Sequence, residues 1–91
     1  MAKYRKKPVV IDAVRLPAID EDPSDEVMQF LDMANATGSN VESDRDGGVV
    51  VYTLEGDMRG DPGDWLIRGV KGEIYPCKPD VFEATYDRVD D

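Results

Sequence analysis

Short apolar runs alternate with tight-turn residues through the second half of the sequence, over residues 49–89. The turn segments are rich in Gly, Pro and Asp, which interrupt and reverse β-structure. Apolar runs too short for helices and bounded by such turns are typical of a small antiparallel sheet. We therefore expect strands at residues 49–54, 65–70, 73–77 and near 84–88.

The turns between these strands have specific chemistry. In residues 61–64, Pro presets the second position and Gly permits positive φ at the third, which predicts a type II turn. The Lys-Gly pair at 71–72 predicts a two-residue hairpin connection. The Lys-Pro-Asp sequence at 78–80 favours a single helical turn, with Val81 and Phe82 facing inward, before the last strand.

The first half of the sequence predicts one strand and one helix. In an extended conformation, residues 9–16 would place apolar side chains on both faces, so we expect a strand that is covered on both faces. After a polar connector, Asp22 is the expected N-cap and Pro23 the first helical residue. An apolar stripe with helical spacing follows at Val27, Phe30, Leu31 and Ala34. The helix should end within residues 35–38, and a short strand is expected at 40–43.

These elements predict an α+β fold in which residues 1–91 form one small domain. A meander of about five short strands tends to curl into a partly closed barrel, because closure removes exposed strand edges. A helix of this length is marginal by itself in water, so it must pack on the sheet. We thus expect a small antiparallel, β-barrel-like meander with one packed α-helix.

The sequence is acidic overall, but its basic residues are unevenly placed. A net charge of −9 and a pI near 4.3 argue against direct nucleic-acid binding, because phosphate contacts rely on Lys and Arg. A basic patch lies near the N-terminus, at Lys3, Arg5, Lys6 and Lys7. One alternative is that this patch faces an acidic surface of its own fold or of a neighbouring subunit. The other is that it is a charged arm exposed to solvent, and we favour this solvated arm because exposed ion pairs are weak. Homo-oligomerisation is a further expectation, since a short chain with exposed strand edges gains core by pairing.

No apolar run is long enough to span a membrane, and the N-terminal apolar run is too short for a signal peptide. Cys77 is the single cysteine, so no disulfide forms within the chain, as is typical of intracellular proteins. We expect a cytoplasmic protein without membrane contact. For Cys77 we favour packing as a small apolar residue over a nucleophilic role.

Histidine is absent, which removes the commonest general base and the commonest metal ligand. A Ser-His-Asp or Cys-His site cannot be built within one chain. Four carboxylates around one expected loop could gather near a divalent cation: Glu55, Asp57, Asp61 and Asp64. We favour turn formation and edge protection for them, because Asp is a preferred turn residue. No catalytic residue, metal site or cofactor is therefore expected.

One group of residues suggests a binding surface on or beside the 65–77 hairpin. Trp65 and Tyr75 form an aromatic platform if they share a face, and such a platform suits a base, a nucleotide or a peptide. Its expected rim comprises Asp64, Arg68, Lys71 and Lys78. The alternative is that Trp65 is a core residue, as the single Trp of a small domain usually is.

Three segments resemble a group of short bacteriophage and prophage proteins. They are YRKKPVVIDAV at 4–14, TLEGDM at 53–58 and PGDWLIRGVKGEIYPCKPDVFEATY at 62–86. Residues 17–48, with the expected helix, fall outside the resemblance. The resemblance implies a phage gene product that acts in the bacterial cytoplasm, and it transfers no catalytic residue.

The function expected first is a non-catalytic accessory protein that acts as a protein-interaction module and modulates a host factor. Strong acidity supports it, because an acidic surface steers towards basic partners, which here are host or phage proteins. The second expectation is a nucleotide-like ligand held on the Trp65 hairpin. A virion or assembly component comes third, and an enzyme that uses carboxylates and a metal comes last.

Overall fold

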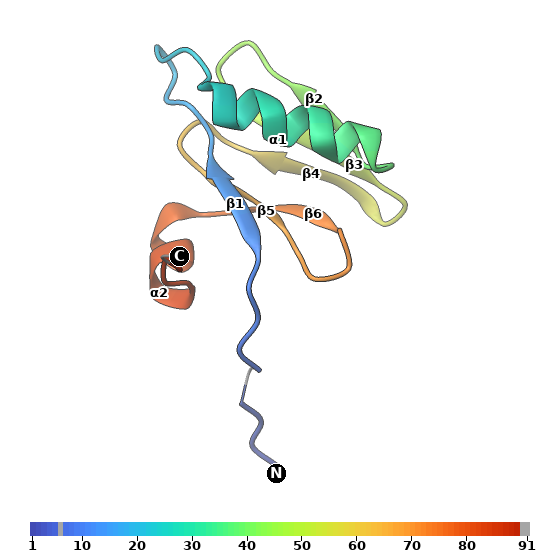
Figure 1. The fold of residues 1–91 in the computed structure, drawn as a ribbon, viewed down its shortest axis with the longest axis vertical. Helices are drawn as coiled ribbons and strands as arrows, with labels where there is room; N and C mark the ends of the chain where they lie inside the picture. The colour runs from blue at the N-terminus through green and yellow to red at the C-terminus, as the bar shows by residue number, and fades with distance from the viewer. Residues whose placement is uncertain (6, 90–91) are drawn as a thin grey trace.

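The computed structural model describes residues 1–5 and 7–89, so Lys6 of the expected basic patch lies outside the described residues. Figure 1 shows the chain as two sheets with a helix beside each of them. The expected α+β class with mainly antiparallel sheet is confirmed. In chain order the elements are β1 (Asp12–Arg15), α1 (Asp25–Ala36), β2 (Asn40–Ser43), β3 (Val49–Thr53), β4 (Gly56–Gly60), β5 (Trp65–Arg68), β6 (Ile74–Cys77) and α2 (Pro79–Thr85).

The strands form two three-stranded antiparallel sheets, ordered β1-β5-β6 and β2-β3-β4. The described strands do not close into a barrel. Instead, both sheets contribute to one hydrophobic cluster. Sheet β1-β5-β6 supplies Val14, Leu66 and Ile74, sheet β2-β3-β4 supplies Val41, Val49 and Val51, and α1 supplies Val27, Phe30 and Ala34.

Strand β4 lies where the sequence predicted a loop. It pairs with β3 through a tight turn in which Gly56 has a φ of 127°. Met58 is the one large apolar residue of β4, so the strand has too little alternation to be recognised from its sequence. Gly60 ends β4, where a Cβ would lie 3.1 Å from Leu16 Cδ1 and 3.2 Å from Pro76 Cβ. A Cβ at residue 60 would therefore crowd both side chains, which favours glycine where β4 approaches the other sheet.

The expected strand near 84–88 is wrong, because α2 occupies residues up to Thr85 and Tyr86 caps it. The helix is longer than the single turn expected. Val81 and Phe82 favour strands by their intrinsic propensity, but packing decides their conformation here. Phe82 is half-buried as expected, but Val81 is 52% exposed.

Two expected boundaries of the first sheet are also wrong. The strand expected at 9–16 is only Asp12–Arg15, and Val10 is 74% exposed because no element covers it. The expected two-residue hairpin is a longer connection over 69–73, closed by a hydrogen bond from Gly69 N to Glu73 O at 2.8 Å. In contrast, the type II turn at 61–64 is confirmed, with a φ of 84° at Gly63.

Helix α1 matches the expected apolar stripe but not the expected cap. The N-cap is Ser24, whose Oγ accepts a hydrogen bond from Val27 N at 3.2 Å, whereas Asp22 was expected. A serine in extended conformation directly before the helix satisfies one of its unpaired N–H groups, and Asp22 lies too far from them.

We predict that Ser24→Ala lowers the free energy of unfolding by about 1 kcal/mol, because it leaves this N–H group without its partner. Asp22→Ala should change it by less than about 0.5 kcal/mol, as at an ordinary surface site. Urea unfolding followed by circular dichroism measures both. Equal losses in the two variants would contradict the assigned cap.

Candidate functional site

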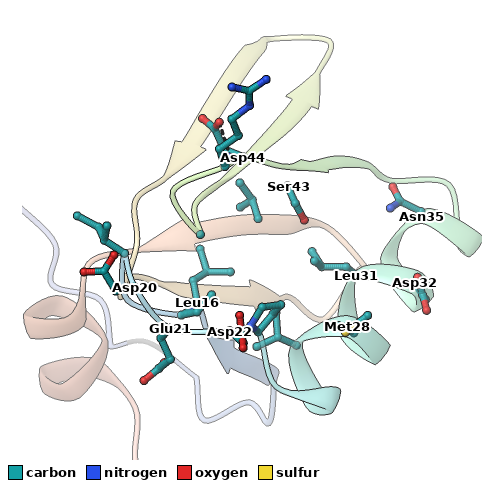
Figure 2. Close-up of a pocket in the computed structure, with 17 residues that line it drawn as sticks. Leu16, Asp20, Glu21, Asp22, Met28, Leu31, Asp32, Asn35, Ser43 and Asp44 are labelled. Carbon is teal, nitrogen blue, oxygen red and sulfur yellow. Dashed lines mark hydrogen bonds between the residues drawn. The ribbon is translucent and has the colours of Figure 1, made fainter.

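A groove of about 590 Å³ opens between α1, the connector over residues 17–23 and the loop from β2 to β3 (Figure 2). We call it the acidic groove. Its apolar lining includes the buried Leu16, Val27 and Val49, with Ile19 and Met28 exposed at its edge. Its acidic residues are Asp20, Glu21, Asp22, Asp32 and Asp44.

The connector that forms one wall of the acidic groove is held by the turn at 61–64. Leu16 N donates to Asp64 O at 2.8 Å, and Gly63 N donates to Pro17 O at 3.1 Å. Glu21 N donates to Ala18 O at 3.0 Å, which gives the connector a turn of its own. These bonds fix the wall of the groove to the sheet β1-β5-β6, so the groove is pre-formed by backbone contacts.

The acidic groove carries a strong excess of negative charge. Among the residues that the structure describes, five carboxylates line it, and Arg45 is the one Lys or Arg in the lining. The hydrogen bond from Arg59, and then that from Arg45 N, holds the pKa of Asp44 below its usual value. An apolar floor below an acidic rim can accept a segment that combines apolar and basic side chains.

Charged side chains next to the acidic groove form a network that connects the two sheets. Arg59 of β4 pairs with Asp44, with Asp46 at 2.7 Å and with Asp61 at 3.2 Å. Lys78 Nζ then pairs with Asp61 Oδ2 at 2.7 Å and Asp64 Oδ2 at 2.9 Å. Asp64 is only 5% exposed, and its Oδ2 also accepts from Asp61 N at 2.9 Å.

This network gives Asp64 and Lys78 a structural role in the protein. The four carboxylates considered as an alternative cation site are separated, since Glu55 and Asp57 lie at one end of β4 and Asp61 and Asp64 beyond the other. Within residues 1–5 and 7–89, no three His, Cys, Asp or Glu side chains are arranged to hold a metal ion. Arg59 and Lys78 pair with Asp61, and Lys78 also with Asp64.

The network makes stability depend on pH. Hydrogen bonding to Lys78 lowers the pKa of Asp61 below 3.8, and Asp61 in turn raises the pKa of Lys78 to about 12. The contribution of Asp61 is thus fully present above pH 3.8 and is lost as the pH falls through its lowered pKa. We predict that Lys78→Met reduces the loss of stability between about pH 5 and about pH 2.

Urea midpoints measured across this pH range test the prediction. Lys71→Met is the matched control, because Lys71 is exposed on the 69–73 turn and pairs with no acidic side chain of the described residues. The control should follow the wild-type pH profile. A Lys78→Met profile identical to the wild type would show that the pair does not couple stability to protonation.

The aromatic residues of the second half meet on the outer face of sheet β1-β5-β6. Trp65 stacks on Phe82 with ring centroids 4.0 Å apart and an angle of 7°, and Phe82 lies 5.1 Å from Tyr86. The Tyr75 and Tyr86 hydroxyls are 3.3 Å apart. Burial, and then this hydrogen bond, raise the pKa of Tyr75 to about 12.

This arrangement brings the two expected platform residues onto one face but places Phe82 over the tryptophan ring. Trp65 pairs with Cys77 and Ile67 with Tyr75, so Trp65 and Tyr75 are on the same side of the hairpin. The expected basic rim is not gathered around them. Arg68 alternates to the opposite face, Lys71 lies at the 69–73 turn, and Lys78 joins the charge network.

We predict that Phe82→Ala shifts the fluorescence emission of Trp65 to longer wavelength and increases its quenching by acrylamide. The reason is that Phe82 covers one face of the ring. Val81→Ala, at a 52% exposed neighbour on the same helix, should leave both unchanged. The same assay with added nucleotides tests the ligand alternative, and a nucleotide-dependent change in wild-type emission would favour that alternative.

The residues of the acidic groove were not singled out from the sequence. Of the expected binding residues that the structure describes, none lines it: Lys3, Arg5 and Lys7 lie in the N-terminal segment, and the Trp65 hairpin is outside the groove lining. The signal available was the acidic run over 20–26, which carries five of the twenty acidic residues. That run could not be assigned to a groove without knowing which segments pack beside it.

Comparison of the chain with family models, curated proteins and solved structures finds no match. The resemblance to phage proteins therefore stays a prediction. None of the helices in the described part of the chain has the length and apolar character needed to cross a bilayer.

Proposed function

We propose that this protein is a non-catalytic interaction module whose acidic groove binds a basic segment with apolar side chains from a partner protein. The observation that carries the proposal is the groove itself, which has an apolar floor and, among the described residues, five carboxylates against one arginine. The exposed Ile19 and Met28 at its edge offer apolar contact to such a segment.

Electrostatics supports this choice of partner. The protein carries a net charge of −9, so long-range attraction favours basic partners, and the groove concentrates that charge at a hollow with apolar contact area. The absence of histidine from the sequence supports a role in recognition over one in catalysis. From the resemblance, the proposed setting is the cytoplasm of a phage-infected bacterium, with a host or phage protein as the partner.

Fluorescence anisotropy with two synthetic peptides tests the proposal. One labelled peptide contains Lys and Leu, and its control contains Glu in place of every Lys. The proposal predicts binding of the basic peptide only, weakening as the salt concentration rises from about 50 to about 500 mM, because salt screens exposed charges. Failure to bind the basic peptide, or equal binding of both peptides, would contradict it.

A further inference from the structure

We infer that the N-terminal arm, residues 1–11, docks in the acidic groove of a second copy of the chain. This inference rests on the proposed function, because it uses the same groove. It names a particular occupant, which is a segment that the chain itself provides.

The charges of the arm and the groove are complementary. The arm contains four of the eleven Lys and Arg residues and no acidic residue. Of the residues placed by the structure, five acidic residues and one arginine line the groove. Lys3, Arg5 and Lys7 are all exposed, and none of the three pairs with an acidic side chain of the described residues. These three basic side chains thus lie without a partner among the described residues, on the same molecule as an acidic groove, which favours their association.

The arm also carries apolar side chains that its own fold leaves uncovered. Tyr4 is 94% exposed, Val10 is 74% exposed and Val9 is 45% exposed. The strand expected to bury the two valines begins only at Asp12. Burial of these side chains against the apolar floor of a groove would remove apolar surface from water, which adds to the charge attraction.

The direction of the arm favours a second copy over its own groove. In Figure 1 the described residues of the arm extend from the N-terminal end of β1 away from α1, whereas the groove begins at Leu16, beyond the other end of β1. To reach its own groove, the arm would have to reverse and return along the full length of β1. An extended arm of eleven residues spans at most about 40 Å, enough to reach a neighbouring molecule.

Each copy offers one arm and one groove, so reciprocal docking closes a two-fold dimer. Docking of the arm would also occupy the surface proposed for the partner. A partner segment would then have to displace the arm, and self-association would reduce the apparent affinity for the partner.

Light scattering on the full-length protein and two charge-reversed variants tests this inference. The arm variant is Lys3→Glu/Arg5→Glu/Lys7→Glu, and the groove variant is Asp20→Lys/Glu21→Lys/Asp22→Lys, which makes the groove lining basic. We expect the wild type to be dimeric at low salt and each variant to be monomeric at the same concentration. An equimolar mixture of the two variants should recover dimers, because the reversed arm now matches the reversed groove. Circular dichroism verifies that both variants fold.

The outcomes separate this inference from the proposed function. A monomeric wild type, a dimeric arm variant or a mixture without dimers would overturn arm docking. If arm docking is overturned in this way but the arm variant binds the basic peptide, the proposed function of the groove stands without arm docking. If the arm variant fails to bind that peptide, both proposals fail.

Discussion

Replacement of Leu66 by alanine should lower the free energy of unfolding by about 3 kcal/mol, in the range usual for buried leucines. Leu66 is 0% exposed and lies on β5, the central strand of its sheet, opposite Val14. It belongs to the cluster that joins both sheets and α1, so the lost side chain leaves a cavity between elements that cannot easily collapse.

Leu54→Ala is the matched control for this prediction. It makes the same chemical change at a residue that is 104% exposed on the turn from β3 to β4, and it should change stability by less than about 0.5 kcal/mol. Urea unfolding followed by circular dichroism measures both variants. Comparable losses in the two variants, or a loss below about 1 kcal/mol for Leu66→Ala, would contradict the assigned core.

The elements predicted correctly are those in which local chemistry and packing agree. Helix α1 has an apolar stripe at helical spacing, and it ends at Ala36, within the stop signal expected over residues 35–38. The turn at 61–64 has Pro and Gly at the positions that a type II turn requires. In both places, neighbouring residues along the chain contain the information, so the sequence is sufficient.

The elements missed are those decided by distant residues. Strand β4 is mostly polar or glycine and is a strand because β3 pairs with it. Helix α2 contains Val81 and Phe82, residue types that are also common in strands. In the helix, Phe82 stacks on Trp65, a contact between residues far apart in the sequence. These residues make their deciding contacts across the fold, where a pattern of local periodicity gives no information.

The acidic groove was missed for the same physical reason. Its lining comes from the connector, from α1 and from the loop between β2 and β3, which are separate in the sequence. The sequence points to the Trp65 hairpin because aromatic and basic residues are close together there. The structure brings Trp65 and Tyr75 to one face but directs the basic side chains elsewhere.

We predict that Asp20→Lys/Asp22→Lys weakens binding of the basic peptide by about 10- to 100-fold. Each exposed ion pair contributes up to about 1 kcal/mol, and reversal replaces attraction by repulsion at two positions. Both residues line the groove, and Figure 2 shows them on the connector beside Leu16. The variant should also lose most of the salt dependence of binding, since fewer favourable charge contacts remain to be screened.

The control for this prediction is Glu55→Lys/Asp57→Lys. It makes the same change in net charge at a second hollow of about 580 Å³, between the β3–β4 turn and β6. If overall charge alone attracts the peptide, both variants weaken binding equally. If the acidic groove is the site, the control should bind within about twofold of the wild type, a difference of less than about 0.5 kcal/mol.

The most direct measurement is a heteronuclear NMR titration of the wild-type protein with the basic peptide. If the protein recognises basic segments through its groove, the largest amide shift changes will fall in residues 19–22, 28–35 and 43–47. The amides of the β3–β4 turn and of the Trp65 hairpin should remain in place. Shift changes concentrated on that turn or that hairpin, with the groove amides unmoved, would contradict recognition through the groove.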